Sequence, residues 1–316
     1  MNSSDLLTPP QPFLFNTMAI VGVGLIGGSV GLAAKKQGLV ERIIGVDPDV
    51  EALALAKRRG VIDFGTQSLE EGVREANLVL LATPVSVTVS LLPVLLSLVL
   101  SDALITDVGS VKSEIVQMGG EVFGRRFVGG HPMAGSEKNG VEASSESLFA
   151  GKPWAIVRGT EFDPDTDPYA QHLAEFVTAL GATPVFLDST LHDKTVATVS
   201  HLPHVLAYAF AGSAQKGLPS ETLWKLAGSS FRDFTRIAHA DPELWTGILL
   251  ANRDALLDTL TDFETSLKGL REALESGNLE ILQEEIEKRR LLQESVEEVT
   301  LLPRTAGRNL EQNSEG

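Results

Sequence analysis

Residues 18–27, MAIVGVGLIG, decide the fold of this chain. The apolar run Met18–Val23 predicts a short buried strand, and Leu25–Gln37 has helical character and ends at Gly38. The turn between them has the Gly-x-Gly-x-x-Gly spacing, in which the glycines permit a tight turn, close approach of a pyrophosphate, and close packing of helix on sheet. Because the N–H groups at a helix N-terminus favour phosphates, we expect a dinucleotide to contact Gly22, Gly24, Leu25, Ile26 and Gly27.

An acidic residue at the end of the next expected strand strengthens this interpretation. Asp47 follows the run Arg42–Val46, about twenty residues after the last glycine, where a carboxylate binds the adenosine ribose hydroxyls. Its charge would repel a 2′-phosphate, so NAD is favoured over NADP. The alternative is an ordinary Gly-rich turn with a helix-capping aspartate. Thr83 and Pro84, after the strand Leu78–Ala82, are expected to contact the cofactor too, unless they form a plain strand-to-helix turn.

Beyond this segment, short apolar strands alternate with helices up to about Asp188. This alternation predicts an α/β fold with a Rossmann-type, doubly wound parallel sheet covered on both faces. The further expected strands are Leu104–Asp107, Phe127–Gly129, Trp154–Val157 and Thr183–Leu187, and the further expected helices are Asp49–Arg59 and Asp167–Leu180.

After Asp188 the pattern becomes helical, so we expect an all-helical substrate and dimerisation domain over 189–302. Residues 1–15 are expected to form a flexible arm, 16–188 the dinucleotide-binding domain, and 303–316 a polar tail. Asp241-Pro242 is a strong helix start, and an apolar stripe predicts one helix from there to Gly277-Asn278, followed by another over Leu279–Thr300. Since the stripe exceeds what one copy can bury, we expect a homodimer.

Composition and charge exclude several classes of protein. The chain of 316 residues carries a formal net charge of -16, which argues against nucleic acid or an anionic membrane as a partner. An anionic substrate would therefore need a local cluster of positive charge. Cysteine is absent, which excludes disulfides and thiolate chemistry and fits a cytoplasmic location. The N-terminus does not resemble a signal peptide, and the apolar run Val79–Leu100 is better explained by a buried strand, loop and helix than by a membrane span.

Later motifs carry a more specific signal. They are TDVGSVK at 106–112, GGHPMAGS at 129–136, SHLPH at 200–204 and FRDFTRIA at 231–238, together with Leu148-Phe149 and Pro153-Trp154. With the Gly-rich turn, they resemble the prephenate/arogenate dehydrogenase family of tyrosine biosynthesis. The resemblance runs in order from about Met18 to about Asn252, and the second and last of these motifs together are highly specific.

The resemblance implies an enzyme that oxidatively decarboxylates prephenate, arogenate or both, with NAD(P) as hydride acceptor and without a metal. The products are 4-hydroxyphenylpyruvate or tyrosine. It also implies roles for individual residues: His131 assists deprotonation of the ring hydroxyl, Ser110 binds the same hydroxyl and holds His131, and Arg236 binds a substrate carboxylate. The further substrate-site candidates are His201, Arg232, Ser136, Trp245 and Lys112.

Four of these residues also have an ordinary structural interpretation. His131 could be a turn histidine, Ser136 a loop hydroxyl, and Arg232 and Arg236 surface partners of Asp233 and Glu243. A different two-domain reductase, or a dinucleotide-sensing protein, would keep the Gly-rich turn without the catalytic set. Ser229 and Ser230 replace part of a run that is usually glycine-rich in the family, which leaves prephenate against arogenate preference open. His192 is left without an assigned role.

Overall fold

The computed structural model describes residues 14–135, 138–159, 163–214, 216 and 219–301, without the side chains of 220 and 291–301. The chain divides into two compact units, one ending at Leu257 and the other beginning at Asp258. Residues 1–13 of the predicted arm and the polar tail at 303–316 lie outside the described residues. The domain boundary expected at Asp188 stays a prediction. No helix in the described part of the chain is long and apolar enough to cross a membrane.

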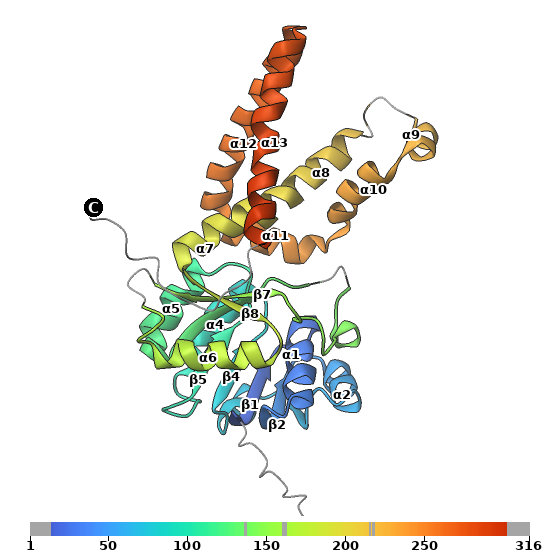
Figure 1. The fold of residues 1–316 in the computed structure, drawn as a ribbon. Coiled ribbons are helices and arrows are strands. Elements are labelled where there is room, and N and C mark those ends of the chain that lie inside the picture. The colour runs from blue at the N-terminus through green and yellow to red at the C-terminus, as the bar shows by residue number, and fades with distance from the viewer. Residues whose placement is uncertain (1–13, 136–137, 160–162, 215, 217–218, 302–316) are drawn as a thin grey trace, which may run out of the picture. The chain divides into compact units, whose positions relative to one another are not determined.

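An eight-stranded sheet organises the first unit, in the order β3-β2-β1-β4-β5-β6-β7-β8 (Figure 1). The chain order reverses between β1 and β4, and such a switch point is where open α/β sheets bind ligands. The strands are β1 Phe15–Val21, β2 Val40–Val46, β3 Phe64–Thr66, β4 Leu78–Leu81, β5 Leu104–Asp107, β6 Phe127–Pro132, β7 Pro153–Arg158 and β8 Thr183–Asp188.

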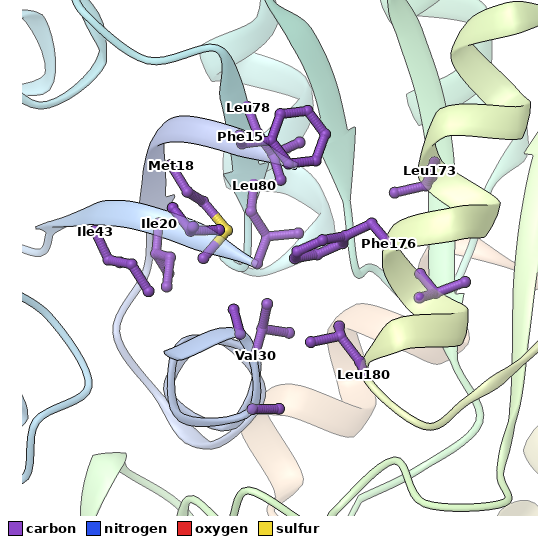
Figure 2. Packing of buried hydrophobic residues seen from close by; sticks show 14 of the residues in the cluster. Phe15, Met18, Ile20, Val30, Ile43, Leu78, Leu80, Leu173, Phe176 and Leu180 are labelled. Atoms are coloured by element: carbon purple, nitrogen blue, oxygen red, sulfur yellow. The ribbon is translucent and has the colours of Figure 1, made fainter. Parts of the chain in front are cut away.

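Helices cover both faces of this sheet. Neighbouring residues of a strand point to opposite faces, and since both kinds of residue are apolar here, each face needs a covering layer. Met18 and Ile20 pack with Val30 of α1 and Phe176 of α6 in one core (Figure 2). Val21, one residue further on, belongs to the core on the other face. The helices of the two layers are α1 Leu25–Lys36, α2 Val50–Arg58 and α6 Pro168–Ala179, opposite α3 Leu69–Val73, α4 Val85–Leu95 and α5 Ser113–Phe123.

The expected doubly wound α/β fold is confirmed, and its sheet is parallel except at one place, where β6 and β7 pair antiparallel. Parallel neighbours need a crossover, usually a helix on a sheet face. The described part of the β6–β7 connection instead carries one short 3-10 helix, η2 Val141–Ala143, which packs against α1. The other strand pairs are parallel, β7 with β8 included.

Three elements escaped the sequence analysis, namely β3, α3 and α5. The first two are very short, and α5 contains Gly119 and Gly120, which lower helix propensity. Phe15 was assigned to the flexible arm, but it lies in β1 with 4% of its surface exposed. It stacks on His172 of α6. A short 3-10 turn, η1 Gly124–Arg126, leads from α5 into β6.

The helices after β8 differ from expectation at two points. A π-helical segment, η3 Ala197–His201, separates α7 Ser189–Val196 from α8 Leu202–Ala214. Pro203 accounts for it, since proline has no N–H and its ring clashes with the carbonyl four residues earlier. The single helix expected from Asp241 to Gly277 is broken at Asn252 into α11 Pro242–Ala251 and α12 Arg253–Glu275. The remaining elements are α9 Ser220–Leu226, α10 Ser229–Arg236, η4 Ile237–His239 and α13 Leu279–Leu301.

Candidate active site

The Gly-rich turn has the geometry that a bound pyrophosphate requires. Gly22 has φ of +95°, and a Cβ there would lie 2.5 Å from the carbonyl oxygen of Ala82. A Cβ on Gly27 would collide with the carbonyl of Gly22. A Cβ on Gly24, in contrast, would meet nothing within 4 Å, and Gly24 caps α1 without a side-chain hydrogen bond. The N–H groups of Leu25 and Ile26 belong to the first turn of α1, where N–H groups lack partners within the helix and favour phosphate oxygens.

Asp47 is tied to this turn by its side chain. Its Oδ2 accepts a hydrogen bond of 2.8 Å from the N–H of Val23, and its Oδ1 accepts one of 2.9 Å from the N–H of Asp49. The helix-capping alternative is wrong for Asp47, because Asp49 caps α2 by accepting from the N–H groups of Glu51 and Ala52. The Asp47 carboxylate thus lies beside the turn with its position set by backbone donors.

Thr83 and Pro84 lie on the other side of the switch point. Pro84 caps α4, and the Thr83 hydroxyl lies 2.9 Å from that of the buried Thr88. Since the carbonyl of Ala82 abuts Gly22, the β4 end and the Gly-rich turn are neighbours. Thr83 and Pro84 therefore form a strand-to-helix turn that lies beside the Gly-rich turn. Their contact with a cofactor stays a prediction.

A buried ion pair joins the ends of β5 and β6. Lys112 donates from Nζ to the Asp107 carboxylate and, over 2.9 Å, to the carbonyl oxygen of Gly130. Asp107 in turn accepts from the N–H groups of Gly109 and Gly130. Both side chains are fully buried, and burial lowers the pKa of Lys112 while the Asp107 charge opposes that shift. The pair fixes the backbone immediately before His131.

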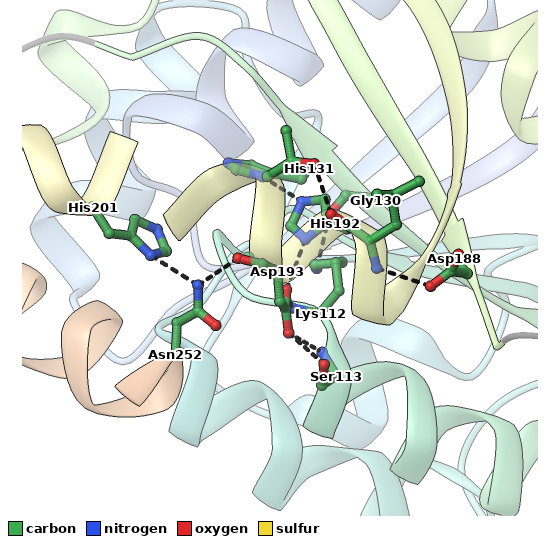
Figure 3. Close-up of polar contacts among 12 residues, drawn as sticks. Lys112, Ser113, Gly130, His131, Asp188, His192, Asp193, His201 and Asn252 are labelled. Carbon is green, nitrogen blue, oxygen red and sulfur yellow. Dashed lines mark hydrogen bonds and ion pairs between the residues drawn. The ribbon is translucent and has the colours of Figure 1, made fainter. Parts of the chain in front are cut away.

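His131 is the penultimate residue of β6 and belongs to a chain of side-chain contacts (Figure 3). Its Nδ1 lies 2.9 Å from Nε2 of His192, and Nδ1 of His192 lies 2.7 Å from Oδ1 of Asp193. Asp193 also accepts from the backbone N–H groups of Lys112 and Ser113, each at 2.8 Å. Burial, followed by the positive fields of His192, Lys112 and His201, holds the pKa of His131 well below its usual range. A neutral imidazole of this kind suits a general base.

His201, at the end of the π-helical segment, lies in the same network through Asn252. The Asn252 amide donates to the carbonyl oxygen of Asp193 at 2.8 Å and lies 3.0 Å from Nδ1 of His201. Burial lowers the pKa of His201 to about 4. Trp245 stacks on His204, with ring centroids 3.3 Å apart, and meets the His201 ring edge-on at 6.1 Å. Trp245 therefore lies beside His201, at the border of the network that links His201 to Asp193 and His131.

The remaining candidates are placed less centrally. Ser110 lies half-buried between β5 and α5, and among the described contacts the side chain that holds His131 is His192 rather than Ser110. Arg232 and Arg236 lie one turn apart on α10 as expected, both exposed, and Arg232 donates to the carbonyl of Ala227. Their convergence with His131 stays a prediction. Ser136 lies outside the described residues.

The serines at 229 and 230 do not force strain on the backbone. They form the first turn of α10, and no non-glycine residue in the described part of the chain has a positive φ. Gly228 itself has φ of -79°. Serine therefore fits these two positions without backbone strain, because the segment is the start of a helix.

His192, Asp193 and Asn252 are site residues that the sequence analysis missed. No local motif marks them, since the contacts of His131 with His192 and of Asn252 with Asp193 span 61 and 59 residues. The available signal was the adjacent His-Asp pair near the start of α7, shortly after the last strand.

Comparison with known proteins identifies relatives over most of the chain. Residues 30–184 match the family described as "Prephenate dehydrogenase, nucleotide-binding domain", and residues 188–288 match "Prephenate dehydrogenase, dimerization domain". A prephenate dehydrogenase of Lactococcus lactis subsp. cremoris is 39% identical over 253 residues, which are 78% of this chain and 68% of the relative.

Solved structures agree with these matches. Prephenate dehydrogenase from Aquifex aeolicus, in complex with hydroxyphenyl propionate and NAD+, superposes with a TM-score of 0.81 at 33% identity, covering 89% of this chain and 98% of the other. The arogenate dehydrogenase of Synechocystis superposes with a TM-score of 0.74 at 28% identity, covering 90% and 99%.

Proposed function

The chain belongs to the prephenate dehydrogenase family, and we propose that it catalyses the NAD-dependent oxidative decarboxylation of prephenate, of arogenate, or of both. The product is 4-hydroxyphenylpyruvate or tyrosine. The observation that carries the proposal is the buried histidine of β6, whose pKa is held well below its usual range and which lies at the same carboxyl-end edge of the sheet as the Gly-rich turn after β1.

The chain's residues account for each requirement of this reaction. The open space at Gly24 and the first turn of α1 would hold the pyrophosphate, and Asp47 would bind the ribose hydroxyls. Thr83 and Pro84 would line the side of the cofactor site that the end of β4 forms. When bound, the nicotinamide supplies the acceptor for the hydride that leaves the ring carbon bearing the hydroxyl.

His131 would take the proton of the ring hydroxyl as the carbonyl forms. Ser110 would hydrogen-bond the same hydroxyl. The ring carboxylate then departs as carbon dioxide, and the electrons of the broken bond make the ring an aromatic phenolate, which regains one proton to give the phenol. Aromatisation makes the step irreversible. This sequence needs no metal, because aromatisation supplies the driving force.

Arg236 would bind a substrate carboxylate through a bidentate guanidinium contact, with Arg232 one turn away adding positive charge. His201, Trp245 and Ser136 would line the same substrate pocket. These assignments follow the family motifs. They are supported by the placement of His201 and Trp245 at the His131 network.

The test is the initial rate of NADH formation with prephenate and with arogenate in parallel, repeated with NADP. His131→Asn should lower kcat by roughly 10²- to 10⁴-fold, while His172→Asn, whose ring stacks on Phe15, should leave it near the wild-type value. The compound that gives the higher initial rate is the preferred substrate. Well-folded, NAD-binding protein that turns over neither compound would overturn the proposal.

A homodimer and a cytoplasmic location complete the proposed function. Large apolar side chains are exposed on the helices after β8, among them Trp224, Leu226, Leu250 and Leu257, and a partner copy that covers them would gain hydrophobic stabilisation. Absence of cysteine fits a reducing compartment. Size-exclusion chromatography with light scattering at micromolar concentration should give a dimer mass, and a monomer would remove the dimer from the proposal.

A further inference from the structure

Asp193 anchors a directional chain of hydrogen bonds that reaches His131. The two backbone N–H groups at the start of α5, those of Lys112 and Ser113, lack partners within their own helix and donate to the Asp193 carboxylate. The Ser113 hydroxyl donates to it as well. A carboxylate held by three donors at a helix N-terminus is stabilised as the anion. It can therefore only accept from His192, so Nδ1 of His192 carries a proton.

The direction of the next contact follows from this first one. His192 is 1% exposed and His131 is 8% exposed, so an extra positive charge shared by the two rings would be poorly solvated. With one proton on His192, at Nδ1, its Nε2 is an acceptor. The 2.9 Å contact then requires a proton on Nδ1 of His131, which leaves Nε2 of His131 as a bare lone pair.

We propose that His192, anchored on Asp193, is a positioning residue that fixes His131 in the tautomer with a protonated Nδ1 and a basic Nε2. The inference rests on the proposed role of His131 as the base. When Nε2 takes the substrate proton, the new charge on His131 is stabilised through the Nδ1–H bond to His192 and, behind it, the Asp193 carboxylate. No proton needs to leave His131 for His192 in this arrangement.

The tautomer can be measured without turnover. The chain has six histidines, so histidine-selective 15N labelling of the full-length protein gives few ring signals, and His131→Asn identifies those of His131. The expected result at neutral pH is a one-bond proton coupling on Nδ1 of His131 and none on Nε2. A proton on Nε2 in the wild-type protein would overturn the proposal. His172→Gln, which removes a histidine packed on Phe15, should leave the His131 signals in place.

Variants of His192 test whether the hydrogen-bond pattern is what matters. Glutamine offers an N–H to Asp193 and an oxygen to His131, so His192→Gln keeps both polar contacts and cannot titrate. Phenylalanine keeps the ring volume and loses both contacts. His192→Phe should lower kcat roughly 10²-fold and leave the KM for substrate within about threefold, as expected when ground-state binding is untouched. His192→Gln should recover kcat to within about tenfold of wild type and keep the Nδ1 proton on His131.

The outcomes separate this inference from the proposed function. Equal losses in folded His192→Gln and His192→Phe, with NAD affinity and thermal unfolding as checks on the fold, would overturn the tautomer role. If His192→Phe fails to fold, the wild-type signals and the glutamine variant still decide it. A wild-type protein that shows the predicted tautomer but oxidises neither prephenate nor arogenate would instead remove the proposed reaction.

Discussion

The amide nitrogen of Asn252 lies 3.0 Å from Nδ1 of His201 and 2.8 Å from the carbonyl oxygen of Asp193. A carbonyl only accepts, so the atom facing it must be the amide nitrogen, and the other amide proton is directed at His201. Nδ1 of His201 is then unprotonated, and its Nε2 carries the proton. His201 therefore offers a donor, whereas His131 is proposed to offer an acceptor.

Replacing Asn252 should cost stability and weaken the site together. Asn252 is 4% exposed, and Asn252→Ala would leave the Asp193 carbonyl and Nδ1 of His201 without this donor, which costs about 1–3 kcal/mol of unfolding free energy. Urea unfolding measures the loss. Asn139→Ala, which removes an exposed contact to Asp241, is the matched control, and an equal small effect of both changes would contradict the prediction.

The two glycines of the turn should separate folding from cofactor binding. Gly22→Ala places a Cβ against the Ala82 carbonyl at a φ of +95°, so it should lower stability by more than about 1 kcal/mol. Gly24→Ala meets no protein atom within 4 Å. It should unfold like wild type but bind NAD more weakly, because the methyl group fills the space for the pyrophosphate. Thermal unfolding and NAD titration check the pair, and unchanged NAD affinity in Gly24→Ala would place the pyrophosphate elsewhere.

Asp47→Asn should lower both stability and the preference for NAD over NADP. The two carboxylate oxygens accept from different backbone N–H groups, so an asparagine must turn its NH₂ toward one of them, at a cost of about 1–3 kcal/mol. Loss of the negative charge also removes the repulsion of a 2′-phosphate. Asp49→Asn is the control, since a single oxygen of Asp49 accepts both capping bonds. A cofactor ratio of kcat/KM that does not change in Asp47→Asn would exclude Asp47 from ribose binding.

The lowered pKa values of His131 and His201 predict how kcat/KM and the free energy of unfolding change at acidic pH. The pKa of His131 lies well below 6.5, so kcat/KM should hold as the pH falls through 6.5 and decline only below it. Both groups bind protons more weakly in the folded state than in the unfolded chain. Stability therefore rises with pH between the folded value, about 4 for His201, and 6.5. His201→Gln should reduce the rise of the urea unfolding midpoint with pH in this range. An activity midpoint at or above 6.5 would contradict the neutral base.

Breaking the Lys112–Asp107 pair should be among the costliest single changes. Both partners are fully buried, so Lys112→Met leaves the Asp107 carboxylate uncompensated at the end of β5 and should cost about 3–5 kcal/mol. Lys225→Met, which breaks an exposed i,i+4 pair with Glu221, should cost less than about 1 kcal/mol. Comparable urea midpoints for the two variants would show that the buried pair is relaxed by other contacts.

The sequence by itself determined the strand–turn–helix at 18–27, the position of Asp47, most strand positions and the family motifs. These are local patterns, in which a strand, a glycine turn or a helix start depends on residues within a few positions of each other. The glycine at 22 illustrates the reason, since only a residue without Cβ fits beside Ala82 at its backbone angle.

Only the tertiary structure decided the direction of β7, the break at Asn252, and the link from Asp193 through His192 to His131. Each of these depends on partners far apart in the chain, 61 residues for His131 and His192 and 59 for Asn252 and Asp193. Helical periodicity continues through Asn252, and nothing in that local pattern indicates that its buried amide donates to a carbonyl on another segment. Such contacts leave no mark on the local pattern, because the free energy of satisfying a buried polar group depends on what the fold brings beside it.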